Sequence, residues 1–134
     1  MKTYKPTSPS RRNMVTINYR EVLTESKPHK ALTKGGKRDM GRNNQGRITT
    51  RHKGGGNKRK YRMIDFKYDK QDIPAKIETV EYDPNRSAFI SLVCYSDGER
   101  RYVVMPKGVK VGDTFLVSED APLTAGNRLS LIHI

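Results

Sequence analysis

The chain has 134 residues and a strongly unbalanced charge, with 27 Lys and Arg against 14 Asp and Glu. The formal net charge is +13 at pH 7 and the pI is near 10.0. This length fits one small domain, and this charge is typical of proteins that bind polyanions. No apolar run approaches the roughly 18 residues of a membrane-spanning helix, and no apolar segment follows the basic amino terminus as in a secretory signal. We therefore expect no membrane partner.

The positive charge is confined to one half of the sequence. Residues 1–70 contain 20 basic and 5 acidic residues, whereas residues 71–134 contain 7 basic and 9 acidic residues. Hydrophobic residues follow the opposite trend, with 17 in the first half and 28 in the second. We therefore expect a basic extension attached to a folded domain, rather than one core that spans the chain.

The first 60 residues form the predicted extension. Within it, residues 14–19 alternate weakly between apolar and polar positions, which favours a short strand. Residues 24–60 contain 12 basic, 2 acidic and only four aliphatic residues, and they are rich in Gly and Asn. Such a segment buries too little apolar surface to offset the entropy of ordering it, so we expect it to be irregular, or disordered when alone.

Residues 61–134 form the predicted folded domain, and their pattern is that of an antiparallel β protein. Short runs of β-branched and aromatic residues alternate with turn signals, whereas no segment keeps a helical period. The predicted strands are residues 61–67, 75–82, 88–95, 101–105 and 114–118. Residues 129–134 resemble a further strand inside which the chain ends, so we expect a sequence cut before its natural end.

Two turns connect the predicted strands. The motif Asp83-Pro84-Asn85-Arg86 places Pro at the second position of a β-turn, and Asp97-Gly98 is a strong short hairpin signal. Five short strands at this spacing suit a small closed barrel, because closure removes exposed strand edges. The residues themselves leave the OB-type barrel and the SH3-like barrel equally open.

The richest functional signal is the basic run at residues 41–62. Its Arg and Lys side chains supply positive charge that matches phosphate oxygens, and the three successive glycines at 54–56 allow close backbone approach and offer bare amide donors. Its Asn, Gln and Thr side chains can bond sugar and base edges. This composition predicts a segment threaded into folded RNA, and RNA is favoured over DNA because no helix is available to enter a major groove.

Two other interpretations of the basic run stay open at this stage. A flexible basic linker or a nuclear-localisation segment would also be rich in Lys and Arg. A free-standing OB-fold module for single-stranded nucleic acid would read bases by stacking them on tyrosines, of which Tyr61 borders the run. On the barrel, Arg86, Arg100 and Arg101 would extend the positive surface.

Other chemistries find no support in the residue pattern. The run at 54–56 lacks the glycine spacing of a dinucleotide fingerprint, and no phosphate-loop motif is present. The three histidines and Cys94 are scattered without the spacing of metal ligands. His52 has no positioned nucleophile or carboxylate beside it in the sequence, so it is better suited to base stacking or phosphate contact than to catalysis. We expect no enzyme activity, no cofactor, no metal and no small-molecule substrate.

Cys94 is the only cysteine, so no disulfide can form within the chain. A reducing compartment is therefore expected.

Five ordered motifs give the chain a family resemblance that covers nearly its whole length. They are Lys5-Pro6-Thr7-Ser8-Pro9 with Arg11-Arg12, Gly41-Arg42-Asn43-Asn44 through His52 with Gly54-Gly55-Gly56, Glu81 through Ala88, Asp97-Gly98-Glu99-Arg100-Arg101-Tyr102, and Pro106-Lys107-Gly108 with Gly112-Asp113. In this order they resemble the family of bacterial-type large ribosomal subunit protein two.

The resemblance implies the fold and the partner. Members of that family bind large-subunit ribosomal RNA early in assembly, lie beside other ribosomal proteins, and are needed for subunit association and an active peptidyl-transferase centre. They carry a basic amino-terminal extension and an OB-type barrel, then an SH3-like barrel and a carboxy-terminal extension with a functional histidine. The resemblance therefore selects the OB type and places the chain on a cytoplasmic or organellar ribosome, as the amino-terminal half of such a protein.

The predicted RNA-binding residues combine the basic run with the arginines of the first motif and of the Asp83 turn. They are Arg11, Arg12, Arg42, Asn43, Asn44, Arg47, Thr50, Arg51, His52, Lys53, Gly54, Gly55, Gly56, Asn57, Lys58, Arg59, Lys60, Tyr61, Arg62 and Arg86.

Overall fold

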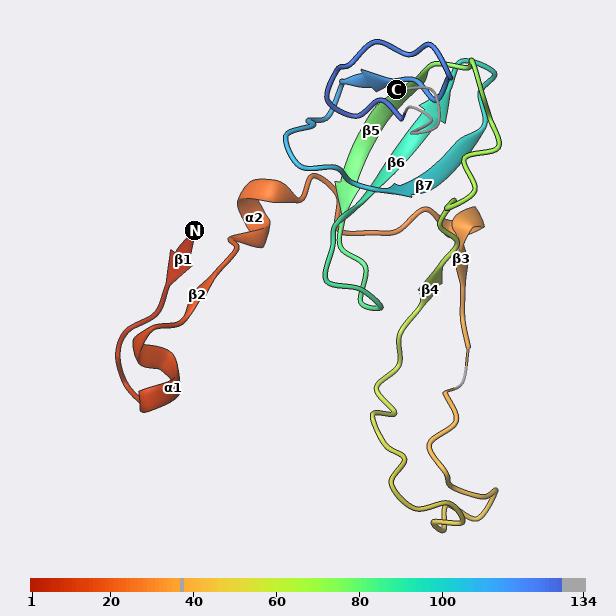
Figure 1. Cartoon of the computed structure of the whole chain (residues 1–134). Coiled ribbons are helices and arrows are strands. Elements are labelled where there is room, and N and C mark those ends of the chain that lie inside the picture. Colours follow the sequence, from red (N-terminus) through yellow and green to blue (C-terminus); the bar gives the residue numbers. More distant parts are fainter. Residues whose placement is uncertain (37, 129–134) are drawn as a thin grey trace.

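The computed structural model describes residues 1–36 and 38–128, and Figure 1 shows a curled sheet from which two segments project. One projection is the amino terminus, and the other is a long loop between the strands labelled β3 and β4. The two projections point away from the sheet in different directions. Over the described ranges, no helix is both long enough and apolar enough to cross a membrane.

The main sheet contains four antiparallel strands. They are β5 (Ala75–Glu81), β6 (Ile90–Tyr95), β7 (Arg100–Val104) and β8 (Thr114–Phe115), in the spatial order β7-β6-β5-β8. The pairing of β5 with β6 shifts between Ile77 and Thr79, which marks a bulge, and bulges increase the local twist. The curled antiparallel sheet fits an OB-type barrel, so the predicted all-β fold is confirmed.

Alternation along the strands places apolar side chains on both faces of the sheet. One face carries the larger core cluster, which includes Ile77, Val93, Tyr95 and Phe115. The other face carries Ile90, Leu92 and Tyr102, and these are covered by Leu32 and Ile64 from the chain that precedes β5. The sheet therefore depends on residues outside it to cover its second face, since strands covered on one face only would leave these side chains in water.

Both predicted turns are present. Arg86 N donates to Asp83 O across the turn between β5 and β6, at 3.4 Å. Between β6 and β7, Gly98 has φ +86°, and its N–H donates to Tyr95 O at 2.9 Å. A left-handed residue after the turn is what a three-residue hairpin loop requires, and Gly adopts it without steric cost.

The first predicted strand is largely wrong. Residues 61–67 contribute only β4 (Tyr61–Arg62), which pairs with β3 (Thr33–Lys34), and a parallel bridge from Ile64 to Tyr102. The strand stops because the Asp65 carboxylate accepts the N–H groups of Lys67 and Tyr68, each at 3.0 Å, and so turns the chain. An Asp side chain that bonds nearby backbone competes with the sheet hydrogen bonds.

The other strand predictions are close to the structure. Regular pairing within 114–118 ends at Phe115, because Leu116 N donates to the side chain of Asn127 at 2.8 Å instead of to a strand, and Val117 makes an isolated bridge to Arg128. The further strand predicted at 129–134 lies outside the described residues.

The amino-terminal projection is a small hairpin. Strand β1 (Lys2–Thr3) pairs with β2 (Val15–Thr16), with the helix α1 (Pro9–Arg12) between them and α2 (Tyr19–Val22) after them. The strand predicted at 14–19 is thus only two residues long. It gives way to α2, where the Asn18 side chain donates to Glu21 at 2.7 Å.

The first residues of the segment predicted to be irregular are tied to the sheet. Thr24 N donates to Val80 O at 3.1 Å, and Val80 N donates to the Thr24 hydroxyl at 2.9 Å. The 3-10 turn η1 (Lys30–Leu32) then places Leu32 on the sheet. Irregular chain follows β3 at residues 35–36 and 38–40.

Candidate nucleic-acid interface

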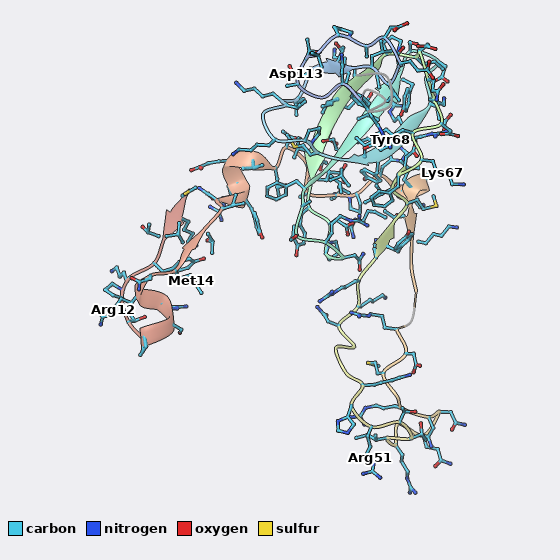
Figure 2. The ribbon with its side chains drawn as sticks, viewed as in Figure 1. Arg12, Met14, Arg51, Lys67, Tyr68 and Asp113 are labelled. Carbon is cyan, nitrogen blue, oxygen red and sulfur yellow. The ribbon has the colours of Figure 1, made fainter. Side chains whose placement is uncertain are left out.

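The long loop between β3 and β4 carries most of the predicted RNA-binding residues, and we call residues 33–62 the arm. Its two sides run from a root at the β3–β4 pair to a tip formed by residues 41–53. Figure 2 shows Arg51 at the far end of the arm, with its side chain directed away from the sheet. A hollow of about 490 Å³ lies between the two sides, lined by Gly35, Arg38, Met40 and Gly56 among others.

The tip is folded by its own hydrogen bonds. The Asn43 side-chain oxygen accepts the N–H groups of Gln45 at 3.0 Å and Arg47 at 2.9 Å, and Arg47 O accepts Asn43 N at 3.0 Å. The Arg42 guanidinium donates to Gly46 O at 2.8 Å. A turn closed by an Asn side chain in this way holds its shape without a regular strand or helix.

Gly41 is the closing point of the tip. Its carbonyl oxygen accepts the N–H groups of Thr49 at 2.8 Å and Thr50 at 3.1 Å, and its own N–H donates to Asp39 at 3.1 Å. Gly41 is buried with φ +70°, and a Cβ at this position would lie 2.4 Å from Thr50 O. Only glycine therefore fits here without moving backbone.

Asp39 also pairs with Lys53, at 2.9 Å. The hydrogen bond from Lys53 and the one from the Gly41 N–H hold the pKa of the Asp39 carboxyl below its usual range. Lys53 is thus partly neutralised by the arm's own acidic residue.

Residues 42–60 are all exposed, and they contain seven basic residues and no acidic one. Arg42 and Lys53 have the partners just given. The side chains of Arg47, Arg51, Lys58 and Arg59 contact no acidic group in the part of the chain that the structure describes. These four charges are therefore presented to solvent at full strength.

Two predicted RNA-binding residues at the root, Arg62 and Arg86, already bond to other groups of the protein. Arg62 is only 8% exposed, and its guanidinium donates to Lys60 O at 2.8 Å. Arg86 donates through Nε to the buried Asp83 carboxylate at 2.6 Å, and its guanidinium lies over the Phe66 ring. Tyr61 beside them is exposed.

Arg11 and Arg12 are far from the arm in the sequence and lie on the other projection. Both are exposed at the end of α1, and Arg11 lies 5.9 Å from the centroid of the Tyr4 ring. Figure 2 shows Arg12 on the amino-terminal hairpin and Arg51 at the end of the arm, which is the other projection. The structure therefore divides the predicted residues between two projections and the root of the arm.

The barrel's own arginines are paired with acidic residues. Arg100 binds Glu78 through two hydrogen bonds of 2.8 and 3.0 Å. Arg101 pairs with Asp65 at 2.8 Å, with Glu99 at 2.6 Å, and with Asp69. The expected positive surface at Arg100 and Arg101 is therefore locally neutralised.

The pKa directions follow from these pairs. Burial opposes ionisation of Asp65, but the hydrogen bonds from Arg101 and from the Tyr68 N–H outweigh it and lower the pKa of this carboxyl. The hydrogen bonds from Arg101 and Lys70 lower the pKa of Glu99. Both carboxyls therefore remain charged at neutral pH and can form ion pairs with Arg101.

The described residues contain no group of three or more His, Cys, Asp and Glu side chains able to hold a metal ion. His52 lies exposed at the tip with φ +61°, and His29 lies at the root, so the two are not brought together.

Residue types alone did not reveal three structural roles. Asn43 was predicted to bind RNA, yet its side-chain oxygen is occupied inside the tip. Gly41 closes the tip and Asp83 holds the turn between β5 and β6, and neither role follows from the residue type alone. The Asx-turn spacing from Asn43 to Gln45 was the signal that could have identified the first.

The chain matches a family model described as Ribosomal Proteins L2, RNA binding N-terminal domain, over residues 29–117. The match covers about two thirds of the chain and includes the whole arm and strands β5 to β8. It therefore assigns RNA binding to the region that contains the exposed cations of the tip. The chain belongs to the family of ribosomal proteins L2, and it is an RNA-binding protein of the ribosome.

Proposed function

We propose that the chain is a structural constituent of the large ribosomal subunit that inserts its arm into ribosomal RNA. The observation that carries the proposal is the excess positive charge of residues 42–60, where every side chain is exposed, no acidic residue is present, and only Lys53 pairs with a nearby carboxylate, Asp39, in the part of the chain that the structure describes. When the cations of such a segment neutralise phosphates, the counterions condensed on the RNA are released, so binding is strong and falls steeply with added salt.

Within the arm, different residue types would make different contacts. Arg47, Arg51, Lys58 and Arg59 would neutralise phosphates, because their charges are unpaired within the described residues. The amides of Asn44 and Asn57, the Thr50 hydroxyl and the His52 ring would bond sugars and base edges, in the way RNA is usually read outside regular duplexes. The remaining predicted residues of the arm, including Lys53, Gly54, Gly55 and Lys60, would lie against the same stretch of RNA.

The chain would divide at residue 60 into an RNA-binding extension and an OB-type barrel that carries it. Arg11 and Arg12, on the amino-terminal hairpin, would contact a separate stretch of the same RNA. Arg62 and Arg86 would act at the root of the arm, since both are already bonded to the protein.

The wider role is a proposal by family membership. The chain would support subunit assembly, subunit association and the peptidyl-transferase centre, beside neighbouring ribosomal proteins, in a cytoplasmic or organellar ribosome. It would have no catalytic residue of its own. Reconstitution of large subunits with the wild-type chain or with a variant in which Arg47, Arg51, Lys58 and Arg59 are Ala, followed by sedimentation, would test the assembly role.

The direct test is the salt dependence of binding to a large-subunit ribosomal RNA transcript. Replacing Arg47, Arg51, Lys58 and Arg59 together by Ala should reduce the slope of log K against log salt by about three, since each phosphate contact contributes about 0.7 to 0.9. Filter binding at several salt concentrations measures the slope.

A matched control removes four exposed barrel cations and so changes the net charge equally. Replacing Lys67, Lys76, Lys107 and Lys110 by Ala should leave the slope nearly unchanged, because these residues lie outside the arm. Equal slopes for the arm variant and the wild type would contradict the proposal. A weak slope combined with a large loss for Tyr61→Ala would instead favour a single-stranded nucleic-acid module that binds by stacking.

A further inference from the structure

The root of the arm is fastened to the turn between β5 and β6 by a small polar cluster. The Asn85 side-chain amide donates to Lys60 O at 3.0 Å, and the Arg62 guanidinium donates to the same oxygen at 2.8 Å. Lys60 is the last residue of the arm before β4. Two side chains therefore converge on one backbone carbonyl at the place where the arm leaves the barrel.

Asn85 is itself held by a buried carboxylate. Asp83 is 0% exposed, and its Oδ1 accepts the backbone N–H of Asn85 at 2.9 Å and the side-chain amide of Asn85 at 3.2 Å. Its Oδ2 pairs with Arg86 Nε at 2.6 Å. A fully buried carboxylate with these partners fixes the turn, because leaving any of them unpaired would be costly.

The side of the arm that leads into β3 is tied to the barrel by the Tyr102 hydroxyl, which accepts the His29 N–H at 2.7 Å. The two sides are joined to each other just outside the β3–β4 pair, where Met63 N donates to Leu32 O at 2.9 Å. Among the described residues of the arm, regular strand pairing between the two sides is limited to the two residues each of β3 and β4. Because this strand pair is so short, we expect the direction of the arm to depend on the side-chain hydrogen bonds at its root.

We propose that Asn85, fixed by Asp83, is a positioning residue that sets the direction of the arm for binding ribosomal RNA. This inference rests on the proposed function: Asn85 would hold the arm, before RNA arrives, in the direction that it has when bound. RNA capture costs less when the arm already points in its bound direction, because fewer conformations are lost on association. Asn85 need not touch RNA for this effect.

The test combines a distance measurement with a binding measurement on the full chain. In a Cys94→Ser background, spin labels at Gln45→Cys on the tip and Ser96→Cys on the barrel report the direction of the arm by pulsed dipolar spectroscopy. Asn85→Ala should broaden the distance distribution in the free protein. Its affinity for the ribosomal RNA transcript should fall by about 2- to 10-fold, as expected for one lost hydrogen bond, with the salt slope unchanged.

Two further variants keep the result interpretable. Ser87→Ala changes an exposed residue of the same turn and should behave like the wild type. Asn85→Asp preserves side-chain size and turn preference but replaces the donor with an acceptor, so it should broaden the distribution even if Asn85→Ala unfolds the turn.

Each outcome decides a different statement. An unchanged distribution, or a broadened one with unchanged affinity, would overturn the positioning role. A loss of affinity with an unchanged distance distribution would mean that Asn85 contacts the RNA directly and would also overturn it. If the wild-type chain itself failed to bind the transcript, the proposed function would fail, whatever the distances show.

Discussion

The Tyr102 hydroxyl donates to the Glu81 carboxylate at 2.7 Å, and both residues are buried, Glu81 being 3% exposed. The same hydroxyl accepts the His29 N–H, so one side chain joins β5, β7 and the segment that leads into the arm. Thr79 also donates to Glu81, at 3.1 Å. A buried carboxylate on the sheet is therefore satisfied by hydroxyl donors rather than by a cation.

Removing this hydroxyl should destabilise the barrel. Tyr102→Phe leaves Glu81 without one donor and His29 N without its acceptor, and we expect the free energy of unfolding to fall by about 1–3 kcal/mol. Urea denaturation followed by circular dichroism measures it. Tyr61→Phe is the control, since the Tyr61 side chain is exposed, and a fall equal to that of Tyr102→Phe would contradict the role of this network.

The same hydroxyl predicts sensitivity to alkaline pH. Burial and then the hydrogen bond to Glu81 raise the pKa of Tyr102 above its ordinary value near 10. Because the folded state holds the proton more tightly than the unfolded state, this stabilisation is complete below about pH 10 and is lost as the pH rises further. Unfolding curves between pH 8 and about pH 11 should show that loss, and Tyr102→Phe should show less of it. An equal loss in both would show that other groups cause it.

Acid should weaken the barrel through Asp65. Its pKa is lowered in the folded state, so the stabilisation is present above the unfolded value of about 3.9 and is lost as the pH falls below it. We expect Asp65→Asn to be less stable than the wild type at pH 7 but less sensitive to acid between about pH 5 and pH 2. Thermal unfolding across this range is the measurement. Parallel curves for the two proteins would exclude Asp65 as a source of the acid sensitivity.

The glycines of the arm should differ sharply in their tolerance of a side chain. Gly41→Ala places a Cβ against Thr50 O and forces a left-handed residue, so the tip should open and RNA affinity should fall by about tenfold or more. Gly36→Ala meets no atom within 4 Å and has no left-handed φ, and Gly36 is not among the predicted RNA-binding residues, so this variant should bind nearly as well as the wild type. Competition binding to the ribosomal RNA transcript compares them. An equal loss for the two variants would mean that the packing of Gly41 does not shape the tip for binding.

Two adjacent asparagines of the tip offer a matched pair. Asn43→Ala removes the acceptor that closes the turn to Gln45 and Arg47, whereas Asn44→Ala removes an exposed side chain. We expect the larger loss of affinity from Asn43→Ala, with faster amide exchange at Arg47 in the free protein. If amide exchange at Arg47 were unchanged, Asn43 would not be the residue that shapes the tip.

Strong local signals predicted the barrel well. Alternation and the Asp97-Gly98 turn fixed β6 and β7 to within two residues, because both elements are governed by neighbours in the sequence. The strand at residues 61–67 failed for a physical reason: Asp65 competes for the backbone, and Tyr61 pairs with the distant Lys34 instead of joining the main sheet. Tertiary contacts of this kind leave no periodic trace in the sequence.

The candidate site was predictable as a composition but not as a geometry. Charge and glycine content identified residues 41–62, and the structure presents most of them on one arm. The burial of Arg62, by contrast, depends on Lys60 O and on the packing of the root, which no local pattern encodes. The engagement of Arg86 with the buried Asp83 carboxylate likewise required the three-dimensional turn.

The pairing of Arg100 and Arg101 with their acidic neighbours has a consequence for how the molecule meets a polyanion. With the barrel close to neutral and the cations gathered on the projections, the protein behaves as an electric dipole. In the field of a folded nucleic acid such a body experiences a torque that turns the charged end forward before contact. The separation of the basic projections from the nearly neutral barrel therefore orients the protein before it contacts the nucleic acid.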